Sequence, residues 1–190
     1  MSKEIELKAY VDDYQATLSL LRGSSDISDE KYTEKFDIYF FNPIVNQAFR
    51  VRKELKKQED TILSKKTIYT VKDKYIDNGI ELNTEFEVDL GFDEFNSSIV
   101  FFDKLGFKES HRKEKKGYSF IYNKFDTPLH IELLEVNDLG WFFEIEFVVD
   151  DEIDEINSGK LVNNLYETLE KFKIPYSNIE KRYYSEMIID

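Results

Sequence analysis

The chain has 190 residues and a formal net charge of −13, and it contains no cysteine. The acidic charge argues against nonspecific nucleic-acid binding, which needs a net basic face. The lack of cysteine excludes disulfides, thiolate metal sites and a cysteine nucleophile.

Two further features bear on where the protein acts and how it is organised. No apolar run approaches the roughly 20 residues that span a bilayer, and the first residues lack the apolar core of a signal peptide. We therefore expect a soluble, cytoplasmic protein with no membrane partner. The 16 Phe and 12 Tyr supply bulky rings for a core. With 3 Pro, 7 Gly and no low-complexity tract, no linker is visible, so we expect one domain over residues 1–190.

Hydrophobic periodicity and turn residues predict mostly strands. The predicted strands cover residues 4–8, 31–41, 48–55, 61–71, 82–90, 128–136 and 141–149, with strand and hairpin residues over 109–122. Helices are predicted over 14–21 behind Asp12 or Asp13, between Asp93 and Gly106, and from about 154 or 158 to 172. For the tail, residues 175–190, we expect a short helix followed by a short strand.

The polar face of these strands carries charges rather than the usual mixture of uncharged residues. Successive side chains of a strand point to opposite faces, so charges two positions apart share a face. This pattern comprises Glu4, Glu6 and Lys8; Arg50, Arg52 and Glu54; Lys66; Glu85 and Glu87; Lys113 and Lys115; and Glu144 and Glu146. About eight alternating strands suit an antiparallel barrel or a strongly curved sheet.

Two arrangements of the charged faces are open. In the first, they are solvated outer faces rich in salt bridges. In the second, the apolar faces pack outward under the helices and the charges point into a shared lumen. Such a lumen needs its charges to pair, or a ligand to complete the set. A polyphosphate chelated by a divalent metal meets both needs, because cations bind phosphate oxygens and carboxylates bind the metal.

These residues also resemble a known family. Glu4-x-Glu6-x-Lys8 is similar to the N-terminal signature of the CYTH superfamily, the triphosphate tunnel proteins. Further motifs follow in the family's order: Asp37-Ile38-Tyr39-Phe40-x-x-Pro43, Arg50-x-Arg52-x-Glu54, Leu63-Ser64-x-Lys66, Glu85-x-Glu87, Leu105-Gly106-Phe107, Lys113-x-Lys115-x-x-Tyr118 and Val136-x-x-Leu139-Gly140-x-Phe142-x-Glu144-Ile145-Glu146. The resemblance covers nearly the whole chain, and the motifs look most like those of the class IV adenylyl cyclase branch.

The resemblance implies an α+β fold, an eight-stranded antiparallel β-barrel with helices packed outside, often dimeric, that binds a triphosphate with Mg²⁺ or Mn²⁺. Carried over by position, the residues that would bind phosphate oxygens are Lys8, Arg50, Arg52, Lys66, Lys113 and Lys115. Those that would hold metal are Glu4, Glu6 and Glu144. Those that would orient the cations or support a second metal are Glu146, Glu54, Glu85 and Glu87. Catalysis would fall to Glu4, Glu6, Lys8 and Glu144.

The sequence departs from the family pattern at three positions. Asn83 stands where the family often has Arg, and Lys115 replaces a frequent Arg, exchanging a bidentate fork for a point charge. Leu134 occupies a position where the cyclase pattern usually has Asp. We hypothesise that Glu132, two residues earlier on the same face, compensates for the missing carboxylate. The spacing from Lys115 to Leu134 also predicts a hairpin insertion at residues 123–128.

The resemblance favours conversion of ATP to cyclic AMP and pyrophosphate, with positioning and charge neutralisation as the main sources of catalysis. A second hypothesis is a hydrolase of inorganic triphosphate or thiamine triphosphate, which would use the same tunnel. A third is a noncatalytic binder of nucleotide or polyphosphate. The only histidines are His111 and His130, and no Ser-His-Asp order supports a hydrolase triad. We interpret Trp141 as a packing or tunnel-mouth residue rather than a stacking partner for adenine.

Overall fold

A computed structural model describes residues 2–42, 44, 47–77, 79–149 and 155–189. The strands are β1 (Ser2–Tyr10), β2 (Ile27–Asn42), β3 (Gln47–Gln58), β4 (Thr61–Asp77), β5 (Ile80–Gly91), β6 (Lys108–Tyr122), β7 (Leu129–Val136) and β8 (Gly140–Val149). The helices are α1 (Tyr14–Arg22), α2 (Glu94–Lys104), α3 (Glu155–Lys171), a 3₁₀ helix (Tyr176–Asn178) and α4 (Tyr184–Ile189).

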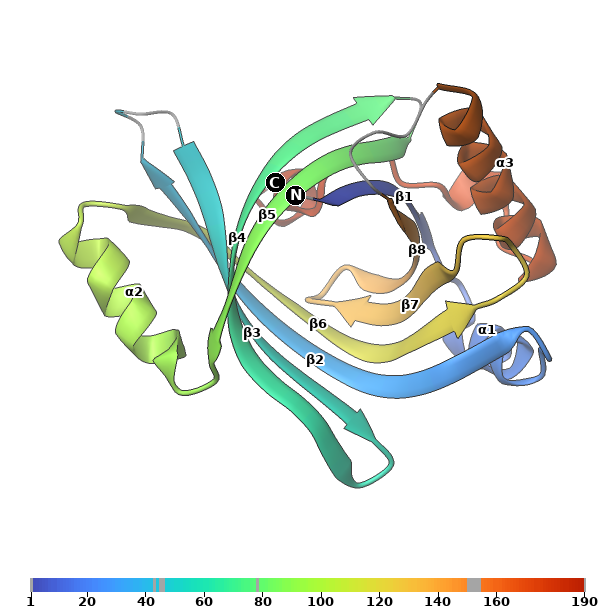
Figure 1. The fold of residues 1–190 in the computed structure, drawn as a ribbon, viewed down its shortest axis with the longest axis horizontal. Coiled ribbons are helices and arrows are strands. Elements are labelled where there is room, and N and C mark those ends of the chain that lie inside the picture. The colour runs from blue at the N-terminus through green and yellow to red at the C-terminus, as the bar shows by residue number, and fades with distance from the viewer. Residues whose placement is uncertain (1, 43, 45–46, 78, 150–154, 190) are drawn as a thin grey trace.

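All eight strands join in one closed antiparallel barrel (Figure 1), in the order β1-β5-β4-β3-β2-β6-β7-β8. The barrel closes because β8 pairs along β1, with Leu7 opposite Ile145 and Lys8 opposite Glu144. In this order β2 lies four strands from β1 in either direction, so these two strands face each other across the lumen. The predicted α+β fold, an eight-stranded antiparallel barrel, is confirmed, with α1, α2 and α3 packed outside it.

The strand alternation places the apolar side chains outside the barrel. Ile5, Leu7 and Ala9 of β1 are buried in the main hydrophobic core, together with Leu165 and Leu169 of α3. Helices α1 and α3 cover this part of the wall in Figure 1, while α2 lies over the opposite side of the molecule. The charged positions 4, 6 and 8 therefore point inward, as the second of the two arrangements requires.

The structure adds detail to the predictions for the sixth strand and for the helix caps, and it differs from the prediction for the tail. Residues 108–122 form one continuous strand, and residues 123–128 are the loop that joins it to β7. Asp13 caps α1 by accepting a hydrogen bond from the Ala16 amide at 3.0 Å, whereas Asp93 makes no side-chain capping bond to α2. Instead of a helix and a strand, the described part of the tail contains two short helices, and only an isolated bridge joins Ile179 to Ala9.

The last helix, α4, packs on the inner face of the barrel. Tyr184 and Met187 are buried against Leu134 and Phe142, which point into the lumen from β7 and β8. Because the inner positions at this end are apolar, a helix can cover them without burying unpaired charged side chains. Thus α4 covers one end of the lumen.

Among the described residues, no helix is long and apolar enough to cross a membrane.

Candidate functional site

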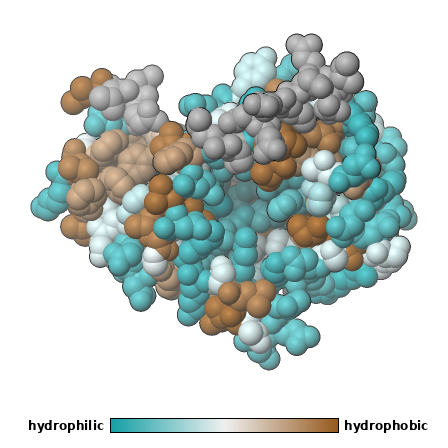
Figure 2. Space-filling view, viewed as in Figure 1, coloured by the Kyte–Doolittle hydropathy of each residue, from teal (hydrophilic) through white to brown (hydrophobic). Residues whose placement is uncertain are grey.

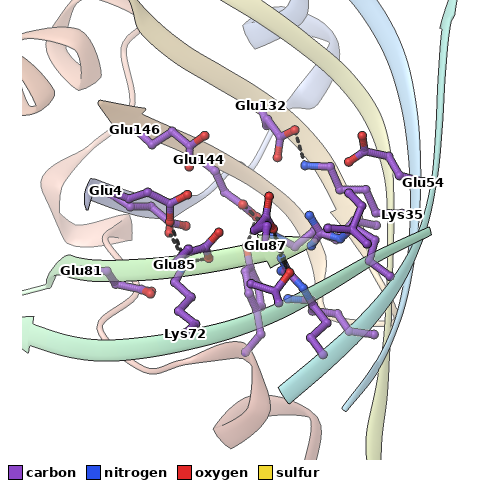
Figure 3. A pocket seen from close by; sticks show the side chains of 18 of the residues that line it. Glu4, Lys35, Glu54, Lys72, Glu81, Glu85, Glu87, Glu132, Glu144 and Glu146 are labelled. Atoms are coloured by element: carbon purple, nitrogen blue, oxygen red, sulfur yellow. Dashed lines mark hydrogen bonds and ion pairs between the residues drawn. The ribbon is translucent and has the colours of Figure 1, made fainter. Parts of the chain in front are cut away.

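The barrel encloses a cavity of about 690 Å³, within the roughly 300–1,000 Å³ range of small-molecule sites. Figure 2 shows hydrophilic side chains around the recessed centre of one face of the molecule. Charged residues line the cavity from every strand, and Figure 3 shows many of them converging on it.

Arg52 and Asp37 form a buried ion pair in the barrel wall. Arg52 Nε and Nη2 donate to the two carboxylate oxygens of Asp37 at 2.6 and 2.9 Å, and Asp37 is fully buried. Burial opposes ionisation of Asp37, but Arg52 and Lys113 outweigh it and hold the pKa of Asp37 well below its usual value. Asp37 fixes the direction of the Arg52 guanidinium.

Lys113 has a less complete set of counter-charges. Its ammonium donates to the Tyr39 hydroxyl at 2.8 Å and lies 3.4 Å from Asp37, which is already engaged by Arg52. Burial and the neighbouring Lys115 ammonium lower the pKa of Lys113 well below its ordinary value, and Asp37 compensates only in part. An anionic ligand would supply the missing negative charge.

Lys115 and Glu144 form a second buried pair. Lys115 Nζ donates to both Glu144 oxygens at 2.6 and 2.7 Å, and the Tyr184 hydroxyl donates to Oε1 at 2.5 Å. Burial opposes ionisation of Glu144, but the Lys115 charge and these hydrogen bonds lower its pKa to about 2. In this structure Glu144, predicted as a metal ligand, is the partner of a cation.

Three other carboxylates form a candidate metal site. Oxygens of Glu4, Glu6 and Glu146 all lie within 4.8 Å of one another. Burial, with the nearby Glu81 carboxylate, raises the pKa of Glu6 to about 7. Burial, with Glu4 and Glu6, raises the pKa of Glu146 well above its ordinary value. Clustered carboxylate oxygens are the donors that hard divalent cations prefer, so this donor set fits Mg²⁺ or Mn²⁺.

Lys72 balances part of this negative charge. Its ammonium lies 2.8 Å from Glu4, 2.8 Å from Glu85 and 3.7 Å from Glu6. Although burial opposes its charge, Glu6, Glu4 and Glu85 raise the pKa of Lys72 well above its usual value. The Lys72 ammonium thus neutralises carboxylates that could also bind a metal ion.

The remaining predicted residues also point inward, but their surroundings differ. Arg50 donates to Thr70 at 2.8 Å and to the half-exposed Glu87 at 3.2 Å. Lys8 pairs with Glu81 and lies 5.4 Å from the Tyr184 ring centre, so it is buried under the C-terminal segment.

The other predicted residues range from the partly exposed Lys66 to the buried Glu54. Lys66 is one-third exposed and pairs with Asp89 at 3.0 Å. Glu132 pairs with Lys35 at 2.5 Å, and Glu54 lies 3.3 Å from Lys56.

Two departures from the family pattern have visible consequences. Asn83 is buried beside the carboxylate cluster, where its Nδ2 lies 3.5 Å from Glu6. Leu134 packs under α4 with Met187, so an Asp at this position would be buried against apolar side chains.

The sequence reading missed several residues of the site, notably Asp37, Lys35, Lys72 and Tyr184. Lys35, Asp37 and Tyr39 alternate on β2 as the predicted charges do on other strands, so this signal was available. Lys72 continues the inner face of β4 beyond the predicted end of that strand. No local pattern placed Tyr184, which reaches the lumen from a separate helix.

Comparison of the coordinates with known structures finds the same architecture over the whole chain. The PH1819 protein of Pyrococcus horikoshii aligns over 98% of both chains with a TM-score of 0.73 and 24% identity. A candidate adenylate cyclase of Vibrio parahaemolyticus aligns over 98% of both chains with a TM-score of 0.72 and 17% identity. The chain has the triphosphate tunnel fold.

The tunnel fold recurs at lower identity. A candidate adenylyl cyclase from Hippeastrum, described as having a dominant triphosphatase activity, aligns over 96% of this chain and 91% of its own, with a TM-score of 0.62 and 13% identity. No family model matches the sequence, and no curated protein matches it significantly. The fold that the motif resemblance implies is confirmed by these structural similarities.

Proposed function

We propose that this protein is a metal-dependent enzyme that acts on a nucleoside triphosphate, converting ATP to cyclic AMP and pyrophosphate. The single observation that supports it most is the division of one cavity into two chemistries. Arg50, Arg52 and Lys113 lie on β3 and β6, while Glu4, Glu6 and Glu146 gather on β1 and β8. A metal–triphosphate complex carries both complementary charges.

The basic residues would bind and orient the phosphate chain. Arg52, held by Asp37, presents its remaining N–H groups in a fixed direction, which suits phosphate recognition. Arg50 has a buried Nε without a partner among the described residues, so a ligand oxygen could satisfy it. A bound phosphate would add to the negative charge that Asp37 supplies only in part to Lys113.

The carboxylates Glu4, Glu6 and Glu146 would hold Mg²⁺ or Mn²⁺. When bound, such an ion neutralises negative charge on phosphate oxygens and lowers the pKa of a coordinated hydroxyl. The proposed role of Glu144 is to keep Lys115 charged and oriented. We retain Glu132 as the residue that compensates for Leu134, since it faces the same lumen and can exchange its Lys35 partner for a ligand.

The alternative is hydrolysis of inorganic triphosphate or thiamine triphosphate by water in the same tunnel. The similarity in fold to the Hippeastrum protein, described as having a dominant triphosphatase activity, keeps this alternative open. A noncatalytic binder of nucleotide or polyphosphate is the third candidate, because most cations in the wall already pair with a carboxylate that a ligand must displace.

One experiment separates these functions. Purified protein is incubated with ATP, tripolyphosphate or thiamine triphosphate, each with Mg²⁺ or Mn²⁺, and the products are identified. Cyclic AMP with an equal amount of pyrophosphate supports the cyclase, and orthophosphate without cyclic AMP supports the hydrolase. Saturable binding with no product supports the binder. Unchanged turnover and metal dependence in Glu132→Gln would remove the role given to Glu132.

A further inference from the structure

The cavity extends beyond its charged wall into a region lined by rings. Tyr39 and Phe41 of β2, Ala48 of β3 and His111 of β6 all line the same cavity as the cations. Aromatic and methyl groups contribute little to binding a phosphate chain, because its oxygens interact with cations and hydrogen-bond donors. This region therefore needs a different explanation.

Tyr39 and His111 form a flat stacked pair. Their ring centres are 4.3 Å apart and their planes differ by 10°. The two residues are register partners on β2 and β6, and the register shifts directly after Tyr39, so that Phe40 pairs with Glu109. The extra residue, Ser110, makes a bulge, a device that re-aims side chains beside functional sites. Its hydroxyl lies 3.1 Å from His111 Nδ1, within reach of holding the ring.

The pair has surface available for a ligand. Tyr39 stacks on one face of His111, and no other ring among the described residues contacts His111. Phe41 is 37% exposed, and its register partner Ala48 contributes only a methyl group. Burial and the neighbouring Lys113 and Lys74 lower the pKa of His111, so the imidazole is a neutral ring at pH 7.

The rings begin where the phosphate-binding cations end. The Tyr39 hydroxyl lies 2.8 Å from Lys113 Nζ, and Arg50 is the register partner of Tyr39 on β3. Strand β2 faces β1 across the barrel (Figure 1). Tyr39 therefore belongs to the strand opposite the one that carries Glu4 and Glu6. A phosphate chain bound between the two walls would place its substituent against the rings.

We propose that the stacked Tyr39–His111 pair is the subsite for a planar aromatic group on the substrate. The tunnel then prefers a triphosphate that carries a nucleobase over inorganic tripolyphosphate. This inference rests on the proposed function and deepens it, because the charged motifs bind phosphate without distinguishing what is attached. Stacking of a base on an aromatic side chain strengthens binding by roughly tenfold or more.

The test compares two ligands in four variants. Binding of ATP and of tripolyphosphate, each with Ca²⁺, is measured by titration calorimetry, and chromatography verifies that the ligands stay intact. Tyr39→Leu and His111→Leu remove a ring. Tyr39→Phe and His111→Phe keep a ring and serve as matched controls, and Tyr39→Phe also isolates the hydroxyl contact to Lys113. Thermal unfolding verifies that each variant is folded.

We expect wild-type protein to bind ATP at least tenfold more tightly than tripolyphosphate. Each leucine variant should lose most of that preference, while each phenylalanine variant keeps it. Equal affinity of the wild type for the two ligands, or equal losses for both in the leucine variants, would overturn the aromatic subsite and leave the phosphate tunnel intact. A wild type that binds neither ligand would instead overturn the proposed function.

Discussion

The Tyr184 hydroxyl donates a 2.5 Å hydrogen bond to Glu144 Oε1, and this contact ties the last helix to the inner wall of the barrel. Lys115 holds the same carboxylate from the other side. The Tyr184 ring also lies 4.5 Å from Lys115 Nζ and 5.1 Å from Lys113 Nζ, within cation–π range. One side chain of α4 therefore contacts both the carboxylate and the cations of the proposed site.

Tyr184→Phe should loosen α4 without disturbing the barrel. The variant keeps the ring but removes a hydrogen bond to a charged group, a loss of about 1.5–3 kcal/mol. Hydrogen exchange should accelerate at the amides of α4 and not at those of β1 or β8. Tyr183→Phe, one residue earlier and half-buried, is the control. Unchanged exchange in α4 would show that apolar packing alone holds the helix.

Arg52→Met should destabilise the fold strongly. The substitution leaves Asp37 fully buried without its bidentate partner, and breaking such a pair costs about 3–5 kcal/mol. Denaturant unfolding measures the loss. Adding Asp37→Asn should restore part of it, because it removes a buried carboxylate charge that Lys113 alone, at 3.4 Å, compensates only in part. The control is Arg112→Met, in which the broken pair with Glu109 is exposed and should matter little.

If Arg52→Met and Arg112→Met unfold at the same denaturant concentration, the Arg52–Asp37 pair stabilises the fold no more than the exposed Arg112–Glu109 pair does. A double variant less stable than Arg52→Met alone would also contradict the interpretation, since it would mean that the Asp37 charge remains favourable without Arg52.

Glu6→Gln should stabilise the metal-free protein at pH 8 and leave it nearly unchanged at pH 5. The pKa of Glu6 is raised from 4.5 to about 7 by burial first and by Glu81. A carboxyl whose pKa is higher in the folded state contributes stability while it is protonated, and that stability is lost as the pH rises through 7. The variant does not lose this stability, so at pH 8 it should be more stable than wild type by on the order of 3 kcal/mol.

Chemical unfolding with a chelator at both pH values tests this prediction. Saturating Mn²⁺ should reverse the order at pH 8, because binding to the native wild type stabilises it by mass action. A variant that is less stable than wild type at pH 8 in chelator would show that the Glu6 charge is well compensated without metal.

Lys113→Met should weaken tripolyphosphate binding by about 10- to 100-fold, the loss of a strong charged contact. The stability of the variant should not fall, because the substitution removes a buried ammonium that repels Lys115. Lys66→Met, at the one-third-exposed rim pair with Asp89, should change the affinity less than threefold. Calorimetric titration and thermal unfolding of both variants check the prediction. A larger effect at Lys66 would reverse the ranking of the two lysines.

By itself, the sequence determined that strands dominate and that the charges of each strand share one face. The period of two in a strand is local, so Glu4, Glu6 and Lys8 share a face whatever the rest of the chain does. The apolar residues between them must be covered, and the predicted helices were available to cover them. The family-like order of motifs then pointed to the tunnel, and the fold confirms it.

Only the tertiary structure decided which charges meet. Lys72 reaches Glu4 from 68 positions away, and Tyr184 reaches Glu144 from 40 positions away. Such pairs depend on the register and closure of the barrel, which local alternation does not encode. For the same reason the sequence could not separate Glu146, beside Glu4 and Glu6, from Glu144, beside Lys115. The stacking of Tyr39 on His111 depends on a single-residue bulge between strands about 70 residues apart. A residue pattern fixes the face on which a side chain lies, but only the closed barrel fixes its partner.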